Sequence, residues 1–204
     1  MNPNPPPASL PPANPPAPCA GELPPASGPV RIVDYDPQWP VLLVREAARI
    51  AAALGDRLQL LEHVGSTAVP GLPAKPVLDL VLAVADSAAE AAYVPAVTAA
   101  GYRLRIREPH WHEPRLFHGP DTRVNLHVFS LGCTEINRML DFRDWLRRDP
   151  ADRALYARTK LDLARRPWPS IQHYADAKTG VVEEILGRAR RAAGGENPSS
   201  LTPP

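Results

Sequence analysis

The chain has 204 residues, 27 of them proline, and a formal net charge of +1 at pH 7. This length suits one domain of ordinary size, and the small charge argues against bulk binding of nucleic acid or of an anionic membrane. No apolar run reaches the roughly 18–20 residues that a membrane-spanning helix needs, and the N-terminus lacks the pattern of a signal peptide. Cys19 and Cys133 match no metal or redox spacing. We therefore expect a cytoplasmic protein without a structural disulfide.

Proline dominates the first 29 residues, in which Leu10 and Leu23 are the only large aliphatic side chains. Such a segment buries too little apolar surface to offset the entropy lost on ordering. The sequence therefore predicts a disordered tail over residues 1–29, one folded domain over residues 30–193, and a second short disordered tail over residues 194–204. We interpret this tail as a dispensable extension, and a docking site for a proline-binding partner is the less favoured alternative.

The first part of the domain alternates between helical and strand patterns. Apolar residues at helical spacing predict the first helix, and Gly55 can end it. Pro95 would interrupt or kink the second helix. In chain order we expect a short lead-in strand over residues 30–33, a helix over 40–54, strands over 58–64 and 77–84, a helix over 87–100, and strands over 102–107, 115–118 and 124–131.

The last part of the domain has a helical pattern throughout. Thr134 is a suitable N-cap, and Asp149-Pro150 separates the first two helices. We expect these helices over residues 134–148, 151–165 and 170–193. Strands first and helices last favour an α/β (α+β) fold, with a mixed β-sheet core flanked by helices and a helical C-terminal portion.

The clearest chemical signal lies in residues 60–84. Gly65-Ser66 follows an apolar run, a loop rich in proline and glycine comes next, and an apolar strand then carries one acid, Asp79, near its start. A carboxylate in a buried strand is costly unless a cation or a donor pairs with it, and glycine allows close approach to the backbone. These residues predict a corner that binds phosphate and a metal ion, although Gly-Ser alone is also common in ordinary turns.

This arrangement suits nucleotidyl transfer, in which backbone amides and a hydroxyl hold phosphate oxygens while carboxylates hold Mg²⁺. Such chemistry normally uses two or more carboxylates, yet Val81 stands two residues after Asp79. Glu62, just before the loop, is the available substitute. Lys75 is interpreted either as a phosphate ligand, for which its point charge is suited, or as a solvated side chain.

Histidines and arginines near these strands add further candidates. His63 and His127 fall on predicted central strands and could join Asp79 in binding a divalent ion such as Zn²⁺ or Mn²⁺. A histidine in an apolar strand is also often an ordinary core residue. Arg115 and Arg123 flank the later strands, and the arginine fork suits phosphate recognition.

Two tyrosine–lysine pairs occur at helical i, i+4 spacing in the last part of the chain. They are Tyr156 with Lys160, and Tyr174 with Lys178. Such a pair can point into a site, but we interpret both pairs as solvated helix faces.

Longer motifs lie along the domain, at residues 33–39 (VDYDPQW), 62–76 (EHVGSTAVPGLPAKP), 78–80 (LDL), 125–129 (NLHVF), 142–146 (FRDWL) and 174–178 (YADAK), with Tyr156 and Lys160 between the last two. In these motifs the chain resembles the GrpB family, which belongs to the nucleotidyltransferase superfamily. The resemblance spans residues 31–188, nearly the whole expected domain.

The resemblance implies a nucleotidyltransferase-like core, with Gly65-Ser66 as the phosphate loop and Asp79 as the metal-binding position. It also implies that related domains occur fused to dephospho-CoA kinases. Two positions depart from the pattern. Val81 replaces the second acid of the superfamily, which argues against two-metal catalysis, and Asn125 stands where many members have histidine.

Two functions follow as hypotheses. The first is a metal-dependent nucleotidyltransferase that uses Mg²⁺ or another divalent ion, takes a nucleoside triphosphate and modifies an acceptor of unspecified chemistry. In it Asp79, Glu62 and His127 are catalytic, Gly65, Ser66, Lys75, Arg115 and Arg123 bind the nucleotide, and Asp79, His63 and His127 bind metal. The second is a catalytically degenerate module that binds a nucleotide, a coenzyme A-like ligand or a metal. The partner that we expect is a small-molecule nucleotide ligand, and the sequence identifies no protein partner.

Overall fold

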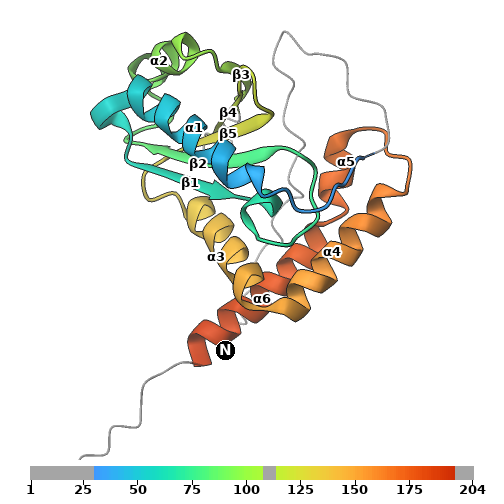
Figure 1. Ribbon diagram of the computed structural model, residues 1–204. Coiled ribbons are helices and arrows are strands. Elements are labelled where there is room, and N and C mark those ends of the chain that lie inside the picture. The colour runs from blue at the N-terminus through green and yellow to red at the C-terminus, as the bar shows by residue number, and fades with distance from the viewer. Residues whose placement is uncertain (1–29, 108–113, 196–204) are drawn as a thin grey trace, which may run out of the picture.

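The computed structural model describes residues 30–107 and 114–195. Its centre is one five-stranded sheet of strand order β1-β2-β5-β4-β3 (Figure 1). Strands β2 and β5 are parallel, and the other neighbouring pairs are antiparallel. The strands are β1 Leu60–Val64, β2 Leu78–Val84, β3 Arg103–Arg107, β4 Arg115–His118 and β5 Val124–Ser130. The predicted mixed sheet is therefore confirmed.

Helices cover both faces of the sheet. Helix α1 (Gln38–Leu54) and the short α2 (Val94–Ala99) pack on the face that carries Leu80 and Leu126, where they build the largest apolar core. Helix α3 (Thr134–Arg148) packs on the opposite face. The strands are apolar on both faces in the centre because both faces are covered, which explains the nearly continuous apolar run of β2.

The C-terminal portion is helical, as predicted. Its elements are α3, α4 (Pro150–Ala164), α5 (Ile171–Asp176) and α6 (Thr179–Gly195). Figure 1 shows them gathered on one side of the sheet, with α3 connecting the two halves. A second core, in which Leu146, Tyr156 and Ile185 are buried, packs these helices against Val69 and Leu72 of the loop before β2.

Three predicted elements differ from the structure. The helix expected over 87–100 is a 3₁₀ turn, Glu90–Ala92, followed by α2, because Pro95 lies in the first turn of α2, where its missing N–H is not needed. The helix expected over 170–193 is divided by a turn into α5 and α6. The lead-in strand is reduced to an isolated bridge between Val33 and Ala74.

The predicted tail over residues 1–29 lies outside the described residues, as does most of the second predicted tail, from residue 196 onward. Helix α6 extends to Gly195, two residues beyond the expected end of the domain. Within residues 30–107 and 114–195, no helix combines the length and the apolar composition needed to cross a membrane.

Candidate functional site

The site is organised around Asp79, near the start of β2. Asp79 pairs with Val64 of β1 on one side and with Asn125 of β5 on the other. Its Oδ1 atom accepts a hydrogen bond of 2.8 Å from Asn125 Nδ2, and His127 Nε2 lies 3.6 Å from the same oxygen. The Asp79 side chain is 32% exposed, so this carboxylate reaches the surface. Asn125 and His127, two residues apart on one strand, therefore face Asp79 together.

The surroundings of Asp79 decide its charge. Burial opposes its ionisation, but the contacts with His127 and Asn125 and the positive charge of Lys75 outweigh burial and lower the pKa of Asp79 below its ordinary value. Asp79 is consequently a carboxylate at neutral pH. It offers an acceptor for a donor or a cation.

Gly65 lies directly against this carboxylate. Its φ of 70° and ψ of −168° belong to a region that only glycine occupies readily. A Cβ added at Gly65 would lie 2.6 Å from Asp79 Oδ2. From the sequence we interpret Gly65 as a position where the backbone lies close to a ligand. In the structure, the space that a Gly65 Cβ would fill is occupied by the Asp79 side chain.

Ser66 begins the 3₁₀ turn Ser66–Ala68 that follows Gly65. Ser66 is half-buried. Burial raises the pKa of Tyr156 of α4, and a side-chain hydrogen bond with Ser66 partly offsets this increase. The loop that carries the Gly-Ser pair is thus in contact with the helical portion of the chain.

Both tyrosine–lysine pairs turn toward this region, which corrects their interpretation as solvated faces. Tyr156, Lys160 and Tyr174 are buried, with exposed fractions of 6%, 2% and 1%. Lys178 Nζ lies 4.5 Å from the centre of the Tyr174 ring, and Lys75 Nζ lies 6.0 Å from the same centre. Sequence spacing identified the pairs, but their burial depends on how the helices pack.

Glu62 lies on the Asp79 face of the sheet but binds a different partner. Glu62 pairs with Val81, two positions along the ladder from Asp79, and its Oε2 atom is 2.6 Å from Arg143 Nη1 of α3. Arg143 also donates to the carbonyl oxygen of His63 at 2.9 Å. This ion pair joins β1 to α3 and engages the carboxylate that the sequence proposes as a stand-in acid.

His63 points to the opposite face of the sheet. It pairs with Leu80, whereas its neighbours Glu62 and Val64 share the face of Asp79. His63 is 7% exposed, and its Nε2 atom lies 2.9 Å from Thr67 Oγ1. The structure therefore does not place His63 with His127 in one metal-binding group.

His63 gives the protein a pH-dependent stability. Burial lowers the pKa of His63 to about 4, so below pH 6.5 the unfolded chain binds a proton that the folded chain does not. Stability is then lost as the pH falls from 6.5 toward 4. We expect the loss attributable to His63 to be about 1–2 kcal/mol between pH 7 and pH 5.

Urea denaturation at both pH values, on the parent chain and on His63→Gln, measures this loss. The variant is expected to lose less stability than the parent between pH 7 and pH 5. Equal losses in the two proteins would show that His63 titrates normally in the folded state.

The two candidate arginines have different positions. Arg115 is 7% exposed, and its Nε atom forms an ion pair of 2.6 Å with Glu90. In the ladder of β4 and β5, Arg115 lies opposite Val128, three residues along β5 from Asn125. The structure does not bring Arg115 to Asp79, and we leave it out of the site. Arg123 is exposed next to the start of β5, and its charge acts on Lys75, so it lies at the rim.

The donor set limits how a metal can bind. Among the described residues, no group of three or more histidine, cysteine or acidic side chains could hold an ion. Asp79, with His127 beside it, can contribute one or two ligands. This suits Mg²⁺, which is often held by one or two carboxylates and completed by phosphate and water oxygens. It does not suit a zinc ion held by protein ligands alone.

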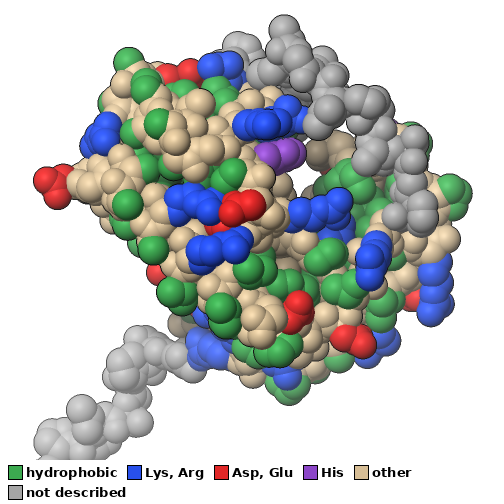
Figure 2. Space-filling model, turned by 45° about the horizontal axis from the view of Figure 1, so that its top comes forward, with side chains coloured by type: hydrophobic (Ala, Val, Ile, Leu, Met, Phe, Trp, Pro, Cys, Tyr) green, Lys and Arg blue, Asp and Glu red, His purple; other side chains and the backbone are tan. Residues whose placement is uncertain are grey.

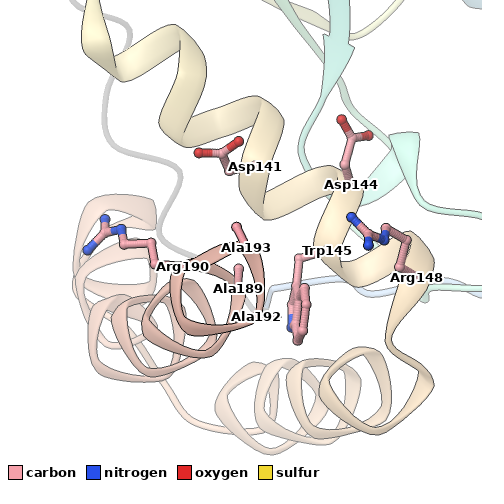
Figure 3. Close-up of a pocket in the computed structure, with 8 residues that line it drawn as sticks. All are labelled: Asp141, Asp144, Trp145, Arg148, Ala189, Arg190, Ala192 and Ala193. Atoms are coloured by element: carbon pink, nitrogen blue, oxygen red, sulfur yellow. The ribbon is translucent and has the colours of Figure 1, made fainter. Parts of the chain in front are cut away.

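A separate pocket lies between α3 and α6, and Figure 3 shows the side chains around it. Asp141 and Trp145 of α3 and Arg190 of α6 are among its lining residues. Asp79 and its neighbours do not line this pocket, so it is distinct from the site described above.

Comparison with known proteins identifies the family. The family model described as GrpB protein matches residues 29–188. The chain belongs to the GrpB family. It is similar to the UPF0157 protein BH1888 of Halalkalibacterium halodurans, with 56% identity over 169 residues that cover 83% of this chain and 87% of that protein.

Other GrpB relatives extend this comparison. The crystal structure of the conserved protein GrpB from Enterococcus faecalis has a TM-score of 0.71 and 27% identity, and it covers 80% of this chain and 99% of that chain. A dephospho-CoA kinase of Mycolicibacterium paratuberculosis is 34% identical over 190 residues, which are 80% of this chain but 47% of the kinase. The GrpB domain thus also occurs within a larger enzyme.

Proposed function

We propose that this GrpB protein binds a nucleoside triphosphate together with a divalent cation at Asp79. The observation that carries the proposal is the ionised Asp79 carboxylate, positioned by Asn125 and packed directly against the Gly65-Ser66 turn. A turn that exposes backbone N–H groups beside a carboxylate can serve the two needs of a nucleotide–metal complex, donors for phosphate oxygens and an acceptor for the cation.

The reaction that we propose for this site is nucleotidyl transfer. A hydroxyl of the acceptor would attack the α-phosphorus, the bond from that phosphorus to the bridging oxygen would break, and pyrophosphate would leave. His127, whose Nε2 atom lies 3.6 Å from Asp79 Oδ1, would receive the proton of the attacking hydroxyl. Asp79 would hold the cation, which would stabilise charge on the phosphate oxygens when bound.

Binding without turnover is the second candidate, and a specific observation favours it. Val81, which stands where a second acid would be, is fully buried against α3, and Glu62 is held by Arg143. The site then has one carboxylate rather than the two or more that two-metal chemistry uses. Relatives named dephospho-CoA kinase favour a coenzyme A-like ligand for such a module.

A thermal-shift panel on the full chain tests the proposal. Nucleoside triphosphates, coenzyme A and dephospho-coenzyme A are each combined with Mg²⁺, Mn²⁺ or Zn²⁺. A ligand at 100 times its Kd stabilises the folded state by about 2.7 kcal/mol. We expect one triphosphate to raise Tm only with a divalent ion, and we expect Asp79→Asn to weaken its binding about 100-fold, since the variant keeps the shape but removes the charge.

Asp56→Asn is the matched control and should retain the shift, because Asp56 is an exposed acid that precedes β1, at the opposite end of this strand from Asp79. A parent chain that responds to no nucleotide, or an Asp79→Asn variant that responds normally, would overturn the proposal. Pyrophosphate release from the bound triphosphate in the presence of candidate acceptors then separates transfer from binding alone.

A further inference from the structure

All three lysines of the chain gather at one place. The sequence contains 23 basic residues, of which 20 are arginine, and its lysines are Lys75, Lys160 and Lys178. They come from the loop before β2, from α4, and from the turn between α5 and α6. The fold brings together three amines that are separated by up to about half of the sequence.

Two tyrosine rings organise the lysine cluster, by which we mean Lys75, Lys160 and Lys178. The Tyr174 ring has Lys178 Nζ 4.5 Å and Lys75 Nζ 6.0 Å from its centre, and Lys160 Nζ lies 4.8 Å from the centre of the Tyr156 ring. Figure 2 shows an opening between the two halves of the molecule, with basic side chains and a histidine beside it.

The positive charge of the cluster is not neutralised by an ion pair within the described part of the chain. Lys160 is 2% exposed and donates a hydrogen bond to the carbonyl oxygen of Pro73, and Lys75 and Lys178 are half-buried. Burial and mutual repulsion lower the pKa of Lys160 to about 7 and that of Lys178 to about 8. Buried cations without a directly paired carboxylate are costly, and a bound anion would relieve the cost.

Two further observations point to a ligand. The hydroxyl of Tyr174 is buried and has no hydrogen-bond partner in the described structure, although buried polar atoms normally have one. In addition, the Asp79 charge acts on both Lys75 and Lys178, which shows that the lysine cluster adjoins the Asp79 site.

We propose that the lysine cluster binds the phosphate chain of a di- or triphosphate, with Lys75 and Lys178 in contact with its oxygens and Lys160 contributing charge from beneath. This inference rests on the proposed function, which places a nucleotide at Asp79, and it adds which residues hold the ligand's phosphates. The anion would lie between the sheet and the helical portion, and the helical portion would supply two of its three cations. Lysine suits this role because its compact ammonium acts on phosphate as a point charge.

Lysine-selective acetylation of the full chain, followed by mass spectrometry, tests the proposal directly. Inorganic tripolyphosphate is the probe, used without nucleoside and without metal. We expect it to slow acetylation of Lys75 and Lys178 at least fivefold while the N-terminal amine, as internal reference, reacts at an unchanged rate. Equal rates with and without tripolyphosphate would overturn the proposal.

Variants provide an independent measurement. We expect Lys75→Met and Lys178→Met each to weaken tripolyphosphate binding at least tenfold, and Lys178→Arg to keep it within about threefold because the charge remains. Arg158→Met removes an exposed cation of α4 and should have no effect. Tripolyphosphate binding that is unchanged in both methionine variants would contradict the proposal. Where a methionine variant does not fold, acetylation of the parent chain still tests it.

The outcomes separate this proposal from the proposed function. A nucleotide that binds with Mg²⁺ through Asp79 but leaves lysine acetylation unchanged overturns the lysine cluster alone. Protection by tripolyphosphate, with no nucleotide binding that depends on Asp79, supports the lysine cluster and overturns the nucleotide–metal site.

Discussion

Replacing Gly65 with alanine is expected to lower the free energy of unfolding by about 3 kcal/mol and to abolish metal-dependent nucleotide binding. Two costs combine. The backbone of Gly65 has φ 70° and ψ −168°, which alanine adopts only under strain. The new Cβ would also lie 2.6 Å from Asp79 Oδ2 and 3.0 Å from Asp79 Cβ, so rotation of the carboxylate alone cannot relieve the clash.

Gly71→Ala is the matched control for this prediction. Gly71 also has a positive φ, of 76°, but an added Cβ would meet no atom within 4 Å. We expect it to cost about 1 kcal/mol and to leave nucleotide binding intact. Urea denaturation gives the two stabilities, and thermal shift gives the binding. Equal losses in the two variants would show that Gly65 matters only for its backbone conformation.

The second large effect is expected for Arg143→Met, which removes the polar contacts of Arg143 that join α3 to β1. Arg143 donates to Glu62, to the carbonyl oxygen of His63, and to both oxygens of Asp144. Its side chain is 10% exposed, whereas Glu62 and Asp144 are 38% and 47% exposed and can be rehydrated. We therefore expect a loss of about 2–3 kcal/mol, below that of a fully buried pair.

In a thermal melt this loss corresponds to a decrease in Tm of about 5–10 °C. Arg158→Met is again the control, because it removes an exposed arginine from α4 and should change Tm by less than about 2 °C. A melting temperature of Arg143→Met within the range of this control would mean that the contacts of Arg143 contribute little to stability.

The sequence predicted the sheet because its strands have strong local signals. Strand β2 is a continuous apolar run with one acid, and the acid itself marked the strand as part of a site. Asp79, Gly65 and Ser66 are close in sequence, so their spatial proximity follows from one loop. The proximity of these three residues can therefore be predicted from the local sequence alone.

The other site residues depend on register and on packing between distant elements. His63 faces away from Asp79 because Val64, and not His63, is registered opposite it. Arg115 was grouped with Asp79 because it flanks a strand, yet the antiparallel ladder of β4 and β5 places it at the far end of β5. The register between β1 and β2, and that between β4 and β5, cannot be predicted from the local pattern of a single sequence.

The tyrosine–lysine pairs show the same limit in the helical portion. The spacing of Tyr156 and Lys160 is also typical of a solvated helix face. Tyr174 lies in α5, whereas Lys178 lies in the turn that follows α5. Their burial follows from the position of α4 and α5 relative to the loop before β2. This arrangement joins residues about 85 to 105 positions apart, at a range where sequence periodicity carries no information.

The order in which the chain supplies the site has a consequence for biosynthesis. The last strand ends at Ser130, whereas Lys160 and Lys178 follow 30 and 48 residues later. Because synthesis proceeds from the N-terminus and domains form as the chain emerges, the sheet and its carboxylate leave the ribosome before two of the three amines. A phosphate ligand bound as we propose would therefore meet all three lysines only after α5 has been made, and it would stabilise the nearly complete domain rather than the early sheet.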